Sequence, residues 1–242
     1  MAARLKLIYE RIPWSLAFRP VFLGAAWFFA PLWLTFIFSL FFFFRSGSKP
    51  GRLFLSLIIL SVLSLLPKWG QFPAPYQSQF LMIFLACYVL AWFFMFAIKE
   101  YFFVERLEVY SMLQTILFFM GTFYFFWQFN GNIISLAGCL FFLGVFLLFY
   151  EFFVFMGGYR GKDVWLHALA SLFMVGELFL AITFLPLGFL NGTAFMVLIF
   201  CIYEYFWLDY FLNTLTQARI LLNISVLLAG SLLVTLFSTW KI

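Results

Sequence analysis

The stretch that decides the fold is Leu16-Ala-Phe-Arg-Pro-Val-Phe-Leu-Gly-Ala-Ala-Trp-Phe-Phe-Ala-Pro-Leu-Trp33, in which a basic residue leads directly into a long apolar run. From Pro20 to Phe44 the chain has 25 residues without a charge, and a helix needs about 20 to cross roughly 30 Å of hydrocarbon. This run is too long for the core of an ordinary signal peptide and has no small-residue cleavage site. We therefore expect an uncleaved first transmembrane helix over residues 20–44, with Arg19 at its start.

The composition of the whole chain is that of a membrane protein. Of its 242 residues, 67% are hydrophobic, 25% are aromatic and 10% are charged, whereas a typical soluble domain is about 25% charged. A soluble domain would need more polar side chains to cover its exterior, so lipid is the expected solvent. The formal net charge of +5 comes from Lys and Arg that lie between apolar runs, which indicates membrane flanks and excludes a nucleic acid partner.

The apolar runs predict an all-α, polytopic integral membrane protein with about eight transmembrane helices. Between Glu108 and Glu151 lie 42 uncharged residues, which the turn-forming stretch Gln128-Phe-Asn-Gly-Asn132 divides into two helices. The second span is short, because its uncharged part from Leu53 to Pro67 covers only about 22 Å, and without it there would be seven spans. The predicted spans are residues 20–44, 52–67, 79–98, 109–128, 133–156, 164–185, 192–212 and 219–239.

The chain leaves no room for a separate soluble domain, because the longest stretch outside the apolar runs is its first 19 residues. Residues 1–19 mix basic and apolar side chains and are predicted to form a basic amphipathic segment that lies in the membrane interface. Residues 20–242 are predicted to form a single transmembrane helical domain.

The orientation in the membrane stays open, because the basic residues divide almost evenly between the two faces of an eight-span protein. We call the face that holds the first, third, fifth and seventh loops side A. Side A would carry Arg45, Lys49, Arg52, Lys99, Arg106, Arg160, Lys162 and Arg219, and the other face would carry Arg4, Lys6, Arg11, Arg19, Lys68 and Lys241. The loops favour a cytoplasmic side A, whereas the N-terminal segment favours the opposite orientation.

Sequence motifs of common catalytic and cofactor sites are absent. Cys87, Cys139 and Cys201 lie in separate apolar runs and are expected to be inert core residues. The sequence has no CxxC, no haem-attachment CxxCH, no phosphate-binding loop and no Ser-His-Asp set. Its one histidine, His167, excludes a pair of axial histidine ligands to haem within one chain. No catalytic residue is assigned, and a role other than an enzyme is favoured.

Polar side chains inside the apolar runs are the candidates for function, because a charge within hydrocarbon costs about 2.5–3.5 kcal/mol even on the lenient insertion scale. Glu151, His167, Glu204 and Asp209 all approach side A and form a candidate intramembrane polar cluster. Glu177 stands apart as the deepest acid, roughly 20 Å into its span.

Three uses of the candidate cluster are open: ion pairing between helices, handling of protons or substrate, and ligation of a metal or haem through His167. Glu204 and Asp209 are five residues apart, about 140° around a helix, and His167 has no ligand at i+3 or i+4. Any metal site would therefore have to be assembled from three helices.

The opening stretch, with Phe18, Arg19 and Pro20 ahead of an aromatic helix, resembles the start of the NnrS family of polytopic membrane proteins. The stretch Leu66-Pro67-Lys68-Trp69-Gly70 is similar to the Pro-Asn-Trp-Thr-Gly turn of that family, with Lys in place of Asn and without the Thr. The family's histidine-bearing element between these two motifs is replaced here by Arg45-Ser-Gly-Ser-Lys-Pro-Gly-Arg52. The resemblance implies a shortened or diverged relative in the bacterial cytoplasmic membrane, with a role in nitric-oxide stress and in handling haem or copper.

Two other functions are compatible with the sequence. The chain could be a non-catalytic membrane subunit that docks through its helices to a larger respiratory or assembly complex, in which case its partners are the lipid bilayer and other membrane subunits. A small transporter is the third reading, although no duplicated halves with paired Gly- or Pro-interrupted helices are evident.

Overall fold

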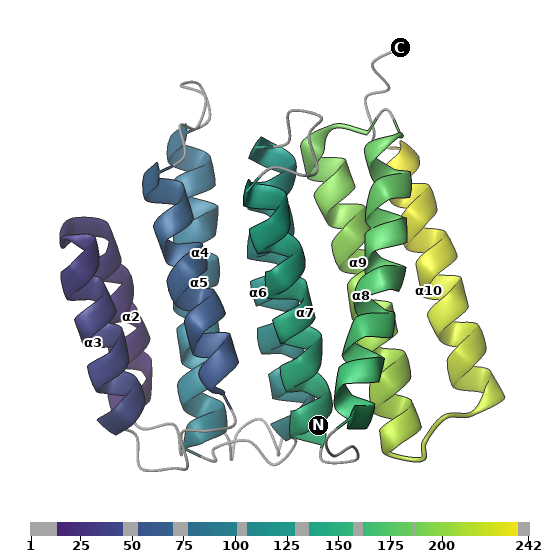
Figure 1. The fold of residues 1–242 in the computed structure, drawn as a ribbon, viewed down its shortest axis with the longest axis horizontal. Helices are drawn as coiled ribbons and strands as arrows, with labels where there is room; N and C mark the ends of the chain where they lie inside the picture. The colour runs from purple at the N-terminus through teal and green to yellow at the C-terminus, as the bar shows by residue number, and fades with distance from the viewer. Residues whose placement is uncertain are drawn as a thin grey trace. The chain divides into compact units, whose positions relative to one another are not determined.

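The structure, a computed structural model, describes residues 14–45, 53–69, 77–100, 106–128, 136–156, 162–185 and 187–236. These residues form helices and contain no strand, which confirms the all-α class (Figure 1). The helices are α2 (Trp14–Phe29), α3 (Leu32–Arg45), α4 (Phe54–Trp69), α5 (Gln77–Lys99), α6 (Arg106–Gln128), α7 (Leu136–Met156), α8 (Lys162–Thr183), α9 (Phe189–Phe211) and α10 (Gln217–Leu236). Residues 1–13, which make up most of the predicted amphipathic segment, lie outside the described residues.

Six of the described helices, α5 to α10, are long and apolar enough to cross a membrane. This confirms a multi-pass membrane protein, but the expected number of eight spans is not reproduced. Helix α4 has 16 residues and covers about 24 Å at 1.5 Å per residue, as expected for the short second span. Each of the predicted spans after the first corresponds to one helix, with ends that differ by a few residues.

The predicted first span, residues 20–44, is wrong as a single helix, because two helices occupy it. Helix α2 ends at Phe29, and α3 begins at Leu32. Pro31 has no backbone N–H and disfavours a helical conformation at Ala30. Thr35 bridges the break, since its hydroxyl donates to the carbonyls of Ala26 at 3.2 Å and Pro31 at 3.4 Å. The result is a helical hairpin, α2–α3, in the first part of the chain.

Contacts within the chain divide it into two compact units, Met1–Ile116 and Leu117–Ile242. In the first unit, α2 packs along α5. The ring of Trp27 lies against the rings of Phe84 and Tyr88, with centres 6.4 and 5.8 Å apart. The two helices approach closely at Gly24, where a Cβ would lie 2.5 Å from the Cγ2 of Val89. Glycine at this position therefore allows α2 to approach α5.

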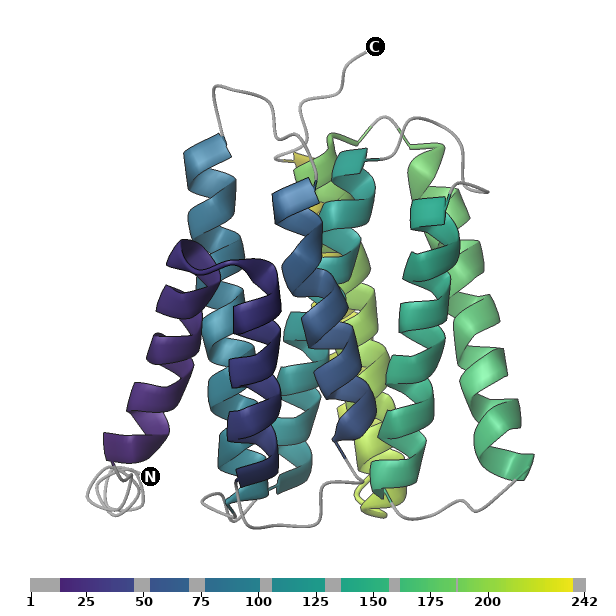
Figure 2. The ribbon, with the colours of Figure 1, turned by 60° about the vertical axis from the view of Figure 1, so that its left-hand side comes forward.

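The start of α2 and the end of α3 lie at the same end of the first unit. Arg19 near the start of α2 forms an ion pair with Glu100, which directly follows α5. Lys99, the last residue of α5, donates to the carbonyl of Phe43 near the end of α3. In Figures 1 and 2 the two helices of the hairpin run side by side, and Figure 1 shows their turn below the upper ends of α4 and α5.

The turn of the hairpin is apolar and open to its surroundings. The side chains of Phe29 and Trp33 on either side of Pro31 are 84% and 63% exposed. At about 24 and 21 Å, α2 and α3 are each shorter than the roughly 30 Å of hydrocarbon. A turn with this composition belongs in lipid, so the hairpin returns to the face from which it starts.

In the second unit, phenylalanine rings fill the space between helices. Phe118 and Phe200 stack with ring centres 4.0 Å apart and planes 8° from parallel. Phe125, Phe141 and Phe179 form a second group, with ring centres 4.8 to 5.4 Å apart. Stacked and edge-on aromatic pairs add to the gain from close packing, so the Phe-rich composition has a structural use here.

The hairpin predicts that positions before α2 and after α3 face the same side of the membrane. We expect an impermeant thiol reagent, applied to sealed membranes, to label Ala2→Cys and Ser48→Cys from one side. Ser78→Cys, at the start of α5, should be labelled only from the other side. These substitutions are made in a background without the three native cysteines. Labelling of Ala2→Cys and Ser48→Cys from opposite sides would show that the first apolar run crosses the membrane once.

Candidate functional site

The four residues of the candidate polar cluster all lie in the second unit, on α7, α8 and α9. Glu151 on α7 and Glu204 and Asp209 on α9 are buried, with exposed fractions of 3%, 1% and 8%. His167 on α8 is half-buried. Glu204 lies on the buried face of α9 one turn after Phe200 and one turn before Leu208. Acids placed in this way are part of the helix interfaces.

His167 lies in an aromatic setting made by three helices. Its ring centre is 5.6 Å from the ring of Phe153 on α7 and 5.6 Å from the ring of Trp207 on α9. Phe153 and Trp207 are themselves 5.1 Å apart and edge-on. The three rings form a triangle at the junction of α7, α8 and α9.

A hydroxyl pair joins α8 to α9 one turn away from His167. The oxygens of Ser171 and Tyr203 lie 2.7 Å apart, and the Ser171 hydroxyl lies 2.7 Å from the backbone carbonyl of His167. A serine hydroxyl has only one hydrogen, so donation to that carbonyl leaves Tyr203 as the donor to Ser171. This chain of hydrogen bonds fixes the rotation of α8 against α9.

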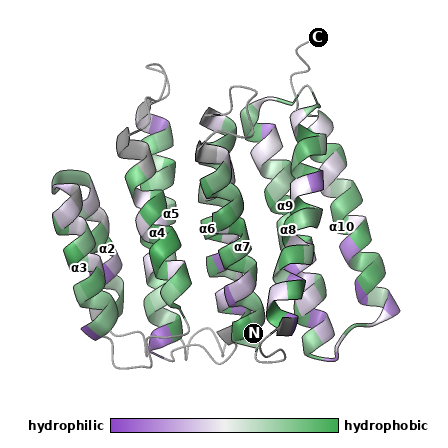
Figure 3. Cartoon of the chain, viewed as in Figure 1, coloured by the Kyte–Doolittle hydropathy of each residue, from purple (hydrophilic) through white to green (hydrophobic). Residues whose placement is uncertain are grey.

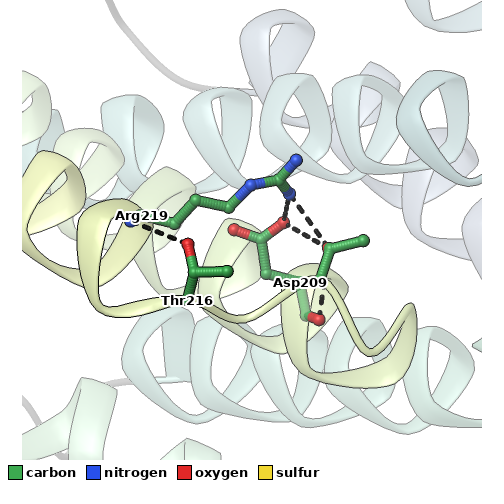
Figure 4. A network of polar contacts seen from close by, with 4 residues as sticks. Asp209, Thr216 and Arg219 are labelled. Carbon is green, nitrogen blue, oxygen red and sulfur yellow. Dashed lines mark hydrogen bonds and ion pairs between the residues drawn. The ribbon is translucent and has the colours of Figure 1, made fainter.

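Asp209 takes part in a turn between α9 and α10. Its Oδ1 accepts from the Thr214 hydroxyl at 3.0 Å and forms an ion pair with Arg219, whose guanidinium also donates to the Thr214 hydroxyl at 2.9 Å. The hydroxyl of Thr216 accepts from the backbone N–H of Arg219 at 3.4 Å (Figure 4). Asn213 in the turn has a φ of 53°, a conformation that asparagine tolerates better than most residues. We call the group Asp209, Thr214, Thr216 and Arg219 the α9–α10 clasp.

The cluster does not supply a set of metal ligands within the described residues. No three His, Cys, Asp or Glu side chains of that part of the chain come close enough to hold a metal ion. Cys87 and Cys201 are half-buried and Cys139 is exposed, and none of the three forms a disulfide. A metal site assembled from three of these side chains, which the sequence left open, is therefore not found among the described residues.

Glu177 is placed differently from the other acids, because its side chain is exposed on the outside of α8. It lies six residues before the end of α8 at Thr183, about 9 Å from that end. Glu204 lies seven residues before the end of α9 at Phe211, so the two acids have similar depths from the nearer helix end.

The residues of the family resemblance have structural contacts. Phe18 is 68% exposed and Pro20 is buried within α2. Arg19 pairs with Glu100, and its guanidinium carbon lies 5.9 Å from the centre of the Phe96 ring. Pro67 and Trp69 lie in the last turn of α4, and their side chains lie outside the described set.

Sequence reasoning missed a polar group at the open end of the hairpin. It consists of Arg19, Arg45, Lys99 and Glu100, which we call the hairpin charge cluster. Lys99 is only 4% exposed, and its ammonium lies 3.7 Å from the centre of the Phe43 ring. Figure 3 shows hydrophilic colour at the lower ends of α3 and α5, where Arg45 and Lys99 are the last residues. The available signal was the Lys99-Glu100 pair that ends an apolar run.

Comparison of the chain with protein-family models, with curated proteins and with solved structures found no match.

The clasp predicts a measurable coupling between Asp209 and Arg219. Arg219→Gln removes the cation from a buried carboxylate, and we expect it to destabilise the chain by about 1 kcal/mol, which lowers the melting temperature by a few degrees. Asp209→Asn should cost a similar amount, and the double substitution should cost less than the sum of the two. Thermal unfolding of the three variants in one detergent measures the cycle, and additive effects would contradict an interaction between the two side chains.

Proposed function

We propose that this chain is a non-catalytic membrane subunit that docks through α8 to a partner transmembrane helix carrying a Lys or Arg. The observation that carries the proposal is the exposed carboxylate of Glu177 in the middle of an apolar stripe. Leu166, Leu169, Phe173 and Leu180 lie on the same face of α8 at intervals of three, four and seven residues, and they are 69%, 41%, 68% and 39% exposed. We call this face the Glu177 stripe.

Contact with lipid alone would destabilise the charged carboxylate of Glu177. A charge within hydrocarbon costs about 2.5–3.5 kcal/mol on the insertion scale. Side chains on a helix tilt toward its N-terminus, so the carboxylate of Glu177 points away from the nearer helix end at Thr183. The carboxylate is therefore directed away from the nearer headgroup region. A positive group on an adjacent helix would offset the cost of holding its charge in hydrocarbon.

The positive group is expected from a different polypeptide. Within the six long helices, every Lys and Arg lies in the first or the last turn: Lys99 ends α5, Arg106 begins α6, Lys162 begins α8 and Arg219 is the third residue of α10. A second copy of the chain packed on the same stripe would bring another Glu177 and no cation. Charge complementarity thus favours a partner with a basic residue inside an apolar helix.

Helix α10 provides a useful contrast within the second unit. None of its residues is buried, so it is more exposed than α8. It carries no charged residue after Arg219. Its outer face can therefore lie against lipid without burying a charge in hydrocarbon. What distinguishes α8 is the charge and not the exposed area.

The proposal predicts that Glu177 is accessible in the isolated chain and protected in its native membrane. A fluorescent, lipid-soluble carbodiimide, which reacts with carboxyl groups that are exposed to lipid or detergent, should label Glu177 of the detergent-purified chain. Labelling in native membranes should fall at least several-fold, because the partner helix covers the carboxyl. Mass spectrometry of the labelled peptide measures both. Equal labelling in the two states would show that Glu177 faces lipid and would rule out docking at this stripe.

A matched pair of variants tests the role of the charge. A photo-reactive residue at Phe173 should give a crosslink to a partner whose linked peptide lies in an apolar helix with a Lys or Arg. We expect Glu177→Gln to reduce that crosslink about tenfold, equivalent to about 1.4 kcal/mol. Asp163→Asn removes an exposed acid from the first turn of the same helix and should leave the crosslink unchanged. Equal loss in both variants would indicate a general effect of charge.

Haem or copper handling, as in the NnrS family, is a second candidate function. The observation in its favour is the place of His167, whose imidazole lies among aromatic rings at the junction of three helices. A second histidine ligand would have to come from a partner chain, because His167 is the one histidine of this chain. The purified chain should then show a haem absorption band or bound copper that His167→Ala abolishes. A band that survives His167→Ala would remove His167 as the ligand.

A further inference from the structure

A cavity lies at the open end of the α2–α3 hairpin. It has a volume of about 250 Å³ and is lined by Phe18, Arg19, Phe42 and Arg45. The two aromatic side chains and the two guanidinium groups come from the two helices of the hairpin in equal number. Because a water molecule takes up about 30 Å³ in the liquid, the cavity is large enough for a phosphate group together with part of the molecule that carries it.

Among the described residues around this cavity, positive charge is in excess. Within the hairpin charge cluster, Glu100 pairs with Arg19. The ammonium of Lys99 is held by the carbonyl of Phe43, which is a neutral acceptor. The guanidinium of Arg45 lies over the ring of Phe41, 5.6 Å from its centre, and its side chain is exposed. Three cations thus share one anion, and the mutual repulsion of the cations favours the uptake of another anion.

The hairpin also changes the balance of charge between the two faces of the membrane. Arg19 lies at the same end as Lys99, so α2 starts on that side. With each of the following helices reversing direction, only Lys68 and Lys241 of the 14 Lys and Arg remain on the other face. The positive-inside rule then makes the face with the cavity cytoplasmic. That leaflet carries anionic lipids and a negative surface potential.

We propose that this cavity is a binding site for a phosphate group, with Arg45 and Arg19 as its ligands. A guanidinium presents N–H donors in a planar fork that matches two phosphate oxygens. The rings of Phe18 and Phe42 provide an apolar wall for the glycerol and acyl part of a phospholipid. The shared chemistry is a phosphate ester or ion, and its two possible sources are the headgroup of an anionic phospholipid and free inorganic phosphate.

The experiment is a titration of the purified, full-length chain in detergent with phosphatidylglycerol, phosphatidylcholine and inorganic phosphate in separate arms. Native mass spectrometry counts the bound molecules, and thermal unfolding gives a second readout. We expect phosphatidylglycerol to bind and to raise the melting temperature, and Arg45→Gln to weaken that binding about tenfold. Arg45→Lys keeps the charge and should lose less, while Arg160→Gln removes one positive charge elsewhere in the chain and should bind as the wild type does.

Each arm gives a decisive result. Binding of inorganic phosphate alone, with the same dependence on Arg45, supports the phosphate site and identifies a soluble ligand as its source. Equal binding of phosphatidylcholine and phosphatidylglycerol, or unchanged binding by Arg45→Gln, overturns the proposal. Because Arg45 is exposed at the end of α3, its substitution should leave the melting temperature without lipid unchanged, so a loss of binding is distinguishable from a loss of fold.

Discussion

Pro31 has no backbone N–H, and the conformation it imposes on Ala30 divides the first apolar run into two short helices. The direction of the chain reverses at this break. Arg19 and Arg45 therefore lie at one end, where Arg19 meets Glu100 and the end of α3 meets Lys99. The close approach of α2 to α5 at Gly24 and the side assigned to the N-terminal basic residues both depend on this reversal.

A second constraint acts on every polar group of the chain, because hydrocarbon offers none of the hydrogen bonds that water offers. The structure meets this constraint mostly at the ends of helices, as in the ion pairs Arg19–Glu100 and Asp209–Arg219. In the interior of the second unit the hydroxyls of Ser171 and Tyr203 meet each other. The outward carboxylate of Glu177 departs from this pattern, and the excess of cations at the hairpin departs from it in the opposite sense. These two imbalances are the reason for the proposed protein partner and the proposed phosphate site.

The sequence was sufficient to predict seven of the helices, because an uncharged run bounded by turn residues predicts one membrane helix. The ends of α7 and α8 illustrate this, as they lie within a few residues of the predicted ends. The first span failed for a physical reason. Hydropathy measures the length of a charge-free run, but it does not measure chain direction, and a proline within an apolar run is compatible with a continuous membrane helix as well as with a break.

The candidate site was partly predictable for a similar reason. Asp209 and Arg219 are ten residues apart across one turn, so the sequence placed them on the same side of the membrane. Arg19 and Glu100 are 81 residues apart, and no local pattern connects them. Whether an acid faces inward or outward also depends on the neighbouring helices, so the sequence did not predict that Glu151 is buried and Glu177 is exposed.

The α9–α10 clasp has a consequence for biosynthesis. A membrane protein is inserted while it is being made, and Asp209 leaves the ribosome ten residues before the arginine that neutralises it. Synthesis adds about 5–20 residues per second, so Arg219 is made roughly a second after Asp209. During that interval α9 holds an uncompensated charge near its end, and its final position in the bilayer is reached only when the start of α10 has followed. The ion pair across the turn therefore couples the insertion of α9 to the synthesis of the start of α10.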